Sequence, residues 1–92
     1  MYKINIVGNI YQENKPSKND KNIKLIEESN NTYDKNAIAI YSIQKNKVKK
    51  LGYVPKNETW FVKKYIKSIK IYGITKVKNK NKPNYYSLLV DL

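Results

Sequence analysis

Apolar and polar residues alternate along most of the chain, which is the pattern typical of half-buried β-strands. The alternation recurs over residues 2–11, 23–27, 37–43, 48–54, 69–77 and 85–92. Short polar segments separate these stretches, with a tight turn expected at 44–46. Five or six strands with short connections predict a mainly β fold with added α structure. We expect a small antiparallel β-barrel, formed by all 92 residues as one domain.

One segment changes period, just after Pro55. Between residues 57 and 69, apolar residues recur at the helical spacing i, i+1, i+4, i+5 and i+8. This stripe consists of Phe61, Val62, Tyr65, Ile66 and Ile69. We expect an α-helix over residues 57–68 that packs against the sheet, with Asn57 as its N-cap. The opposite face of the helix carries Trp60, Lys63, Lys64 and Lys67.

Polar segments connect the predicted strands. Residues 30–36 are dense in turn-forming residues and predict an ordered loop, whereas the Asn- and Lys-rich residues 12–22 predict disorder. Gly52 predicts a bulge or a close backbone approach. Another loop is expected at 79–84. Lysines occupy every second position from residue 76 to residue 82, which on a strand places them along one face. These are Lys76, Lys78, Lys80 and Lys82, which either guide a nucleic-acid backbone or merely solvate a loop.

The composition excludes most catalytic chemistry. The chain has no His and no Cys, so it cannot form a Cys/His zinc site, a Ser-His-Asp triad or an imidazole base. Its glycines are isolated, which excludes phosphate-binding loops. Glu27 and Glu28 are adjacent acids, but neighbours on a strand point to opposite faces. We therefore expect a binding module without cofactor or metal, and not an enzyme.

The net charge is strongly positive, because 19 basic residues against 7 acidic ones give +12. Every basic residue is Lys, an excess that AT-rich codons would also produce. Whatever its origin, this charge attracts polyanions. Without Arg the chain lacks the bidentate fork that reads guanine edges, so contacts to backbone, ends or shape are expected instead. The N-terminal segment has no long apolar run, and we expect a soluble intracellular protein without a signal peptide or membrane span.

Several motifs resemble the HIRAN domain family. The most specific is the Tyr-Asp-x-Asn-Ala-Ile run at residues 33–38, within the segment NNTYDKNAIAI. Supporting matches are Val7 with Gly8, Leu25 with Glu28, and residues 51–55 (LGYVP). The resemblance covers nearly the whole chain. It implies an OB-like barrel that recognises single-stranded DNA, especially a free 3′-hydroxyl end. The chain resembles the free-standing family members found in bacteria, phages and mobile elements.

The resemblance also implies which residues contact the DNA. Tyr33 and Asp34 match the family pair that engages the terminal nucleotide, and Lys56 matches a basic position after the Gly-Tyr-Val run. The first-strand aromatic corresponds to Tyr11 and the last-strand aromatic to Tyr85 or Tyr86. The basic residue that precedes the first-strand aromatic in end-binding relatives is replaced here by Ile10, which removes a phosphate or base contact.

The chemistry of Asp34 suits such a site. A carboxylate in a basic cleft can accept a hydrogen bond from a terminal 3′-hydroxyl, and it repels the phosphodiester of a continuous strand. The alternative is that Asp34 only closes an Asx-turn on its own backbone. Tyr33 and Tyr11 either stack on a base or pack in the core. We expect Asn36 to bond backbone groups of the loop.

A second hypothesis places a protein partner on the basic surface. A phage or mobile-element protein of this size could bind a nucleic-acid-handling complex, such as a helicase or a defence nuclease, and inhibit or recruit it. A Trp among lysines is unusual for solvent and could seat such a partner. The surface consists of Trp60, Lys63, Lys64, Lys67, Lys76 and Lys78. The sequence leaves open whether DNA, RNA or protein is the natural ligand, and whether the process is repair or inhibition of a defence system.

Overall fold

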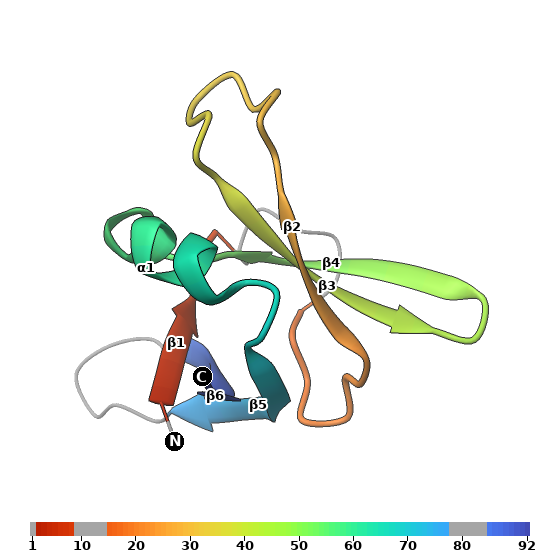
Figure 1. Cartoon of the computed structure of the whole chain (residues 1–92). Helices are drawn as coiled ribbons and strands as arrows, with labels where there is room; N and C mark the ends of the chain where they lie inside the picture. Colours follow the sequence, from red (N-terminus) through yellow and green to blue (C-terminus); the bar gives the residue numbers. More distant parts are fainter. Residues whose placement is uncertain (1, 9–14, 78–84) are drawn as a thin grey trace.

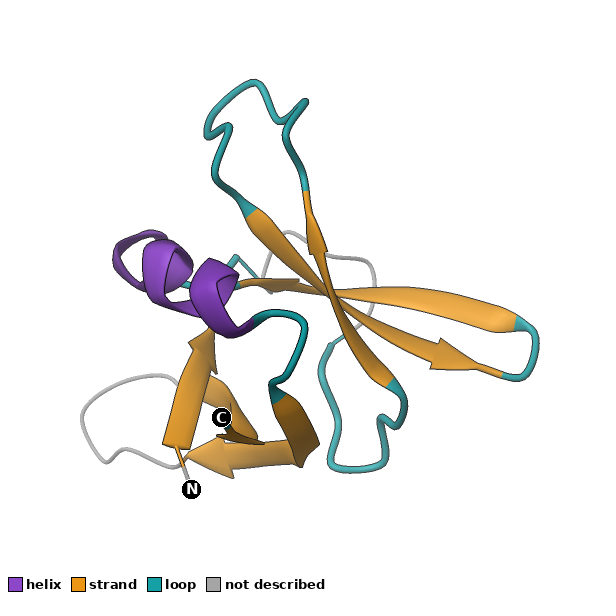
Figure 2. Ribbon diagram, viewed as in Figure 1, coloured by secondary structure: helices purple, strands orange, loops and turns teal. Residues whose placement is uncertain are grey.

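The computed structural model describes residues 2–8, 15–77 and 85–92 (Figure 1). Six β-strands make up half of these residues, and a 3-10 helix leads into one short α-helix (Figure 2). In chain order the elements are β1 (Tyr2–Ile6), β2 (Ile23–Glu27), β3 (Ile38–Gln44), β4 (Lys47–Tyr53), η2 (Lys56–Glu58), α1 (Thr59–Tyr65), β5 (Lys70–Val77) and β6 (Tyr85–Asp91). The mainly β fold with one main helix is confirmed.

The strands form two antiparallel sheets, in the orders β1-β6-β5 and β2-β3-β4. Val7, just after β1, joins the sheets by pairing with Tyr53 at the end of β4 through main-chain hydrogen bonds of 2.9 and 2.8 Å. Over the described residues, pairing thus runs from β5 through β6, β1, β4 and β3 to β2. β2 and β5 do not pair with each other there. The structure therefore does not show the closed barrel that the sequence predicted.

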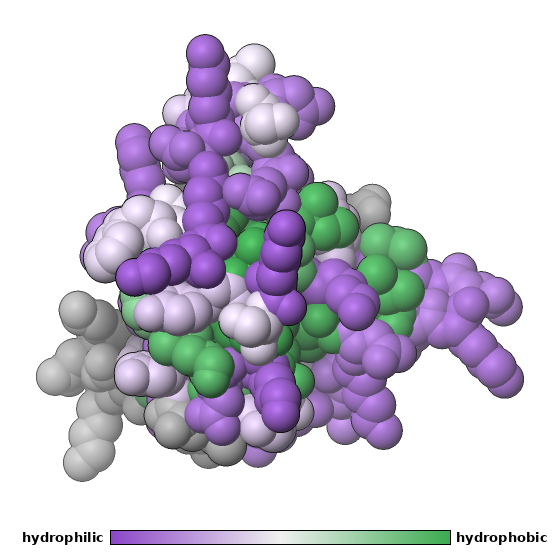
Figure 3. Space-filling model, in the orientation of Figure 1, coloured by the Kyte–Doolittle hydropathy of each residue, from purple (hydrophilic) through white to green (hydrophobic). Residues whose placement is uncertain are grey.

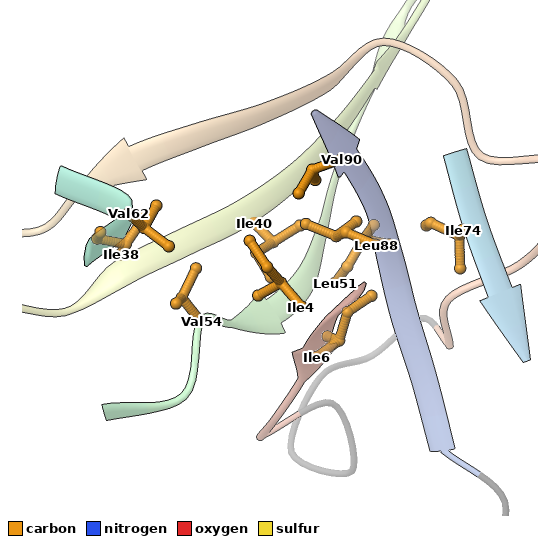
Figure 4. Close-up of a cluster of buried hydrophobic side chains, with 10 residues drawn as sticks. All are labelled: Ile4, Ile6, Ile38, Ile40, Leu51, Val54, Val62, Ile74, Leu88 and Val90. Atoms are coloured by element: carbon orange, nitrogen blue, oxygen red, sulfur yellow. The ribbon is translucent and has the colours of Figure 1, made fainter. Parts of the chain in front are cut away.

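The two sheets and the helix pack around one hydrophobic core (Figure 4). Its buried side chains come from every strand except β2, from α1, and from the residue that follows β4. They are Ile4, Ile6, Ile38, Ile40, Leu51, Val54, Val62, Ile74, Leu88 and Val90. Burying each of them contributes roughly 1.5–3 kcal/mol. A small chain without cysteines depends on this term.

A bulge in β4 changes which side chains meet. Ile40 pairs with Gly52 whereas Tyr41 pairs with Lys50, so Leu51 is an extra residue on β4. Gly52 has a φ of 149°, which favours glycine. The bulge predicted at Gly52 is therefore confirmed. Because the extra residue shifts the strand alternation by one, Lys50 contacts Tyr53, and its Nζ lies 4.5 Å from the centre of that ring.

The helix is shorter than the sequence predicted. α1 begins only at Thr59, because the first turn after Pro55 is the 3-10 helix η2. Asn57 lies inside η2 and is not the N-cap; Glu58 takes that position without a side-chain hydrogen bond. The predicted apolar stripe does face the core, through Phe61, Val62, Ile66 and Ile69.

Residues 15–22 are held against the sheet, contrary to the disorder that their composition predicted. Asp20 is 5% exposed. Its carboxylate accepts the N–H of Ser17 at 2.7 Å and forms an ion pair of 3.2 Å with Lys49 of β4. Composition could not reveal this pairing, because the partner lies far away in the sequence.

Candidate nucleic-acid interface

The loop between β2 and β3 is folded by its own polar side chains. Its ends are joined by the N–H of Glu28, which donates to the carbonyl of Ala37 at 2.9 Å. Within the loop, Oδ1 of Asn31 accepts the N–H of Tyr33 at 2.9 Å and the N–H of Asp34 at 3.0 Å. Asn is favoured in turns for this reason. These bonds fix the backbone of the two motif residues expected to touch a ligand.

Asn31 is in turn anchored to the sheet. Its Nδ2 donates to Oε1 of Glu28 at 3.1 Å, and the hydroxyl of Tyr53 donates to the same oxygen at 2.9 Å. Nζ of Lys50 donates to Oε2 of Glu28 at 3.0 Å and to the hydroxyl of Tyr53. We call these four residues, Glu28, Asn31, Lys50 and Tyr53, the anchoring network. It connects β4 to the loop.

The anchoring network shifts the pKa values of both its charged groups. Burial pushes the pKa of Glu28 upward, but hydrogen bonds from Asn31, Lys50 and Tyr53 outweigh burial and bring it below the ordinary carboxyl value. Burial pushes the pKa of Lys50 downward, but its contacts with Tyr53 and Glu28 raise it above the ordinary amine value. Each charge therefore stabilises the other.

Asp34 closes the Asx-turn that was one of the two alternatives left open by the sequence. Its Oδ1 accepts the N–H of Asn36 at 2.9 Å, which is the Asx-turn. The side chain is nevertheless only half-buried. Among the residues that the structure describes, none donates a hydrogen bond to Oδ2 of Asp34. One oxygen therefore shapes the loop, and the other is available to a ligand.

A pocket of about 420 Å³ opens beside this loop. It is lined by Val7, Gly8, Asn31, Tyr33, Asp34, Ala37, Tyr53, Val54 and Lys56. The structure thus brings Tyr33, Asp34 and Lys56 to one place, as the resemblance implied. The side chain of Tyr33 is 96% exposed, so its ring has no role in the core. Lys56 is also exposed, and no ion pair holds it within the described part of the chain.

Tyr53 is a lining residue that the sequence did not single out. The LGYVP run contains it, but its contact with Lys50 depends on the bulge. Gly8 lies across from it with a φ of 69°, and a Cβ at Gly8 would stand 3.5 Å from Cδ2 of Tyr53. That distance is an ordinary van der Waals contact, so it is the positive φ that favours glycine there.

The two aromatic candidates of the last strand, Tyr85 and Tyr86, do not join this pocket. Tyr11 lies outside the described residues, as do Ile10 and Lys78. Tyr85 begins β6 and is half-buried, and Tyr86 packs against the core. Neither tyrosine lines the pocket. Their contact with a ligand stays a prediction.

The structure divides the predicted basic surface of the helix. Trp60 is 69% exposed, and its indole N–H donates to the carbonyl of Asn57 at 3.0 Å. Lys64 and Lys67 are exposed. Lys63, in contrast, is half-buried and lies against the loop, where its Nζ donates to Oδ1 of Asn36 at 2.8 Å.

This contact corrects the expectation that the Asn36 side chain would bond loop backbone. Lys63 also approaches Glu27 at 3.8 Å. Lys76 is exposed on β5, in the other sheet from the loop. Of the six residues predicted for a partner surface, Trp60 and Lys64 are therefore exposed on α1 and Lys67 is exposed just after it, with Nζ of Lys64 lying 5.6 Å from the centre of the Tyr65 ring.

Residues 2–8, 15–77 and 85–92 contain no group of three or more His, Cys, Asp or Glu side chains placed to hold a metal ion. Within the same ranges, no helix has the length and apolar character needed to cross a membrane.

An exposed tyrosine, a carboxylate with an available oxygen and a lysine meet at one pocket of a basic, mainly β chain. Such parts define a nucleic-acid-binding module. The family model described as the HIRAN domain matches residues 1–91. This protein belongs to the HIRAN domain family, whose members are generally DNA-binding modules. No curated protein and no solved structure matches the chain.

Proposed function

We propose that this HIRAN domain binds single-stranded DNA at a free 3′-hydroxyl end, in the pocket lined by Tyr33, Asp34 and Lys56. We call it the end pocket. The observation that carries the proposal is the divided carboxylate of Asp34, a residue that lines the pocket: Oδ1 is held by the loop, whereas Oδ2 receives no hydrogen bond from the described chain. A lone acceptor is what a terminal hydroxyl requires.

Each residue has a defined part in this proposal. The 3′-hydroxyl donates to Oδ2 of Asp34, a position where the phosphate of a continuing strand would be repelled. The ring of Tyr33 stacks on the terminal base or sugar, which is worth about 1–3 kcal/mol per base. Lys56 attracts a backbone phosphate as a point charge. Because the anchoring network already holds the loop, little ordering is required on binding.

The test compares two oligonucleotides that differ only in a 3′-hydroxyl or a 3′-phosphate, by fluorescence anisotropy. We expect the wild type to prefer the hydroxyl end by about tenfold, since a hydrogen bond to a charged group is worth about 1.5–3 kcal/mol. Asp34→Asn is the informative variant. Its amide oxygen can keep the turn with Asn36, but a donor replaces Oδ2, so the preference should disappear.

Glu27→Gln is the matched control, because it changes the net charge equally and Glu27 does not line the end pocket. It should keep the preference. Equal binding of both oligonucleotides by the wild type would refute the proposal, as would a preference that survives in Asp34→Asn. An RNA strand of the same sequence, measured in parallel, tests whether the 2′-hydroxyl is tolerated.

We infer further that the two sheets are an OB-like barrel opened between β2 and β5. The pairing order β5-β6-β1-β4-β3-β2 supports this, since it would close if the two outer strands met. We also propose that the module has no catalytic activity and delivers or shields a DNA end for another machine. Labelled DNA should therefore be recovered intact after prolonged incubation.

A protein partner is the second candidate, and one observation favours it. Tyr2 and Trp60 are 56% and 69% exposed, and both contact Phe61 edge-on, with ring centroids 6.5 and 5.9 Å apart. Exposed aromatic clusters are typical of interfaces. The partner would be a nucleic-acid-handling complex. Trp60→Ala should then abolish complex formation while the 3′-hydroxyl preference is kept; retained complex formation would count against this candidate.

A further inference from the structure

A second pocket, of about 510 Å³, lies where β2 and β5 face each other without pairing. Strand residues of β2 and β5 line it together with the segment that follows α1. We call it the strand groove. It is lined by Asp20, Lys21, Asn22, Ile23, Lys24, Leu25, Ile66, Lys67, Ile69, Ile71, Tyr72 and Gly73. The strand groove shares no residue with the end pocket, so the two sites can be tested separately.

The lining is apolar where a barrel strand would otherwise cover it. Five aliphatic side chains pack on the core yet stay partly exposed in the groove, namely Ile23, Leu25, Ile66, Ile69 and Ile71. In Figure 3, green hydrophobic atoms break the purple surface in the area between α1, β2 and β5. On the β5 side, a side chain at Gly73 would meet no atom within 4 Å. The core is therefore open to an occupant along this line.

The main chain of β2 is arranged to receive a strand. Asn22 accepts the N–H of Ile43, and Glu28 donates to Ala37. Since antiparallel pairs alternate, the even-numbered residues of β2 bond to β3. Ile23, Leu25 and Glu27 therefore direct their N–H and C=O groups away from β3. As the other edge strand, β5 has outward main-chain groups in the same alternation.

The charges around the strand groove indicate the chemistry of the occupant. Lys21, Lys24 and Lys67 line it and are exposed, whereas Asp20 is buried in its pair with Lys49. A second copy of this chain would place lysine against lysine. A nucleic acid would find one exposed ring, that of Tyr72, beside a row of isoleucine and leucine side chains, whereas stacking of successive bases needs several aromatic faces. An acidic peptide matches both the charge and the backbone geometry.

We propose that the strand groove binds an extended acidic segment of another protein by strand addition to β2. Main-chain hydrogen bonds supply affinity, alternate apolar side chains of the segment cover the aliphatic lining, and its carboxylates meet the lysines. The occupied groove would complete the barrel.

The test uses a capped peptide of about eight residues that alternates Glu and Val, long enough to span β5, added to ¹⁵N-labelled protein. We expect amide shifts in β2 and β5, and hydrogen exchange slowed about tenfold at Ile23 and Leu25. Lys24 and Ile26, already bonded to β3, should change little. The same peptide N-methylated at alternate residues cannot donate those hydrogen bonds and should bind at least tenfold more weakly.

Charge reversal supplies the second arm. Lys24→Glu with Lys67→Glu should weaken peptide binding at least tenfold, whereas Lys45→Glu with Lys47→Glu should not, since Lys45 lies in the turn after β3, Lys47 begins β4, and both are exposed outside the groove. No binding at millimolar peptide, equal binding of the N-methylated peptide, or a lysine-rich peptide binding as well would overturn the proposal. Shifts at the strand groove on adding oligo-dT alone would assign it to nucleic acid instead.

Discussion

The end pocket and the strand groove lie on the same core but are built from different parts. In the end pocket, the anchoring network fixes a loop and so positions the side chain of Asp34. In the strand groove, the exposed parts are main-chain groups of two edge strands and a row of aliphatic side chains. We propose that the first arrangement selects one chemical group, and that the second accepts any extended acidic sequence of suitable alternation.

This difference predicts which substitutions separate the two sites. Substitution of a single polar side chain should abolish binding in the end pocket. Binding in the strand groove should change only when its lysines are substituted or when the main chain of the peptide is modified. Only a substitution in the shared core should abolish binding at both sites.

The largest effect is expected from Leu88→Ala. Leu88 is fully buried in β6, and its truncation should cost about 2–5 kcal/mol of unfolding free energy through lost burial and a cavity. For so small a chain this is a large part of the total, and both sites should fail together. Chemical denaturation measures the loss. Val48→Ala, at a position 65% exposed, is the control and should change stability by less than about 0.5 kcal/mol. Binding at either site by a mostly unfolded Leu88→Ala would contradict this dependence.

Asn31→Ala should come next and should affect the end pocket alone. It removes the acceptor for the N–H groups of Tyr33 and Asp34 and the donor to Glu28. We expect the 3′-hydroxyl preference, measured by fluorescence anisotropy, to fall about tenfold. This corresponds to a loss of about 1–2 kcal/mol of binding free energy. Asn30→Ala, one residue earlier and exposed, is the matched control. Peptide binding in the strand groove should be unchanged in both variants; a loss there would show that the sites are coupled.

The pH dependence tests the anchoring network through Glu28. Its pKa is lowered in the folded chain, so its contribution to stability is complete above the ordinary value of 4.5 and is lost as the pH falls through the lowered pKa. The thermal stability of the wild type should therefore exceed that of Glu28→Gln at neutral pH. The difference should shrink toward about pH 3. A difference that stays constant with pH would show that the charge of Glu28 is unimportant.

The smallest effect concerns Lys56. If it contacts one phosphate, Lys56→Ala should reduce the slope of log affinity against log salt by about 0.7 on single-stranded DNA. Lys45→Ala, remote in the turn between β3 and β4, should leave the slope unchanged. Salt titrations of both variants measure this. Equal slopes for Lys56→Ala and the wild type would remove Lys56 from the site.

The strands were predictable because each depends on local alternation. β2 was predicted with its exact bounds, and the other described strands after β1 begin and end within one residue of the prediction. The start of the helix was not predictable, because a 3-10 turn and an α-helical turn have the same apolar spacing over so few residues. Asp20 was assigned to disorder because its partner, Lys49, is distant in the chain.

The site was predictable where it is local and not where it is assembled. Tyr33 and Asp34 stand in one motif, and the sequence placed both in an ordered loop. The contact of Lys50 with Tyr53 could not be predicted, because residues three apart on a regular strand lie on opposite faces. The extra residue Leu51 reverses that rule, and so completes a network with Glu28, the residue that directly follows β2.

The pairing of Val7 with Tyr53 has a mechanical consequence. Those two hydrogen bonds hold one half of the molecule to the other, and both residues also line the end pocket. A ligand in the end pocket would shield these two hydrogen bonds from water. Because water could then not replace them, the two sheets would separate less readily. The hydrogen-exchange rates of the Val7 and Tyr53 amide protons would then measure this effect. Slower exchange with DNA bound would show that the DNA end holds the two sheets together.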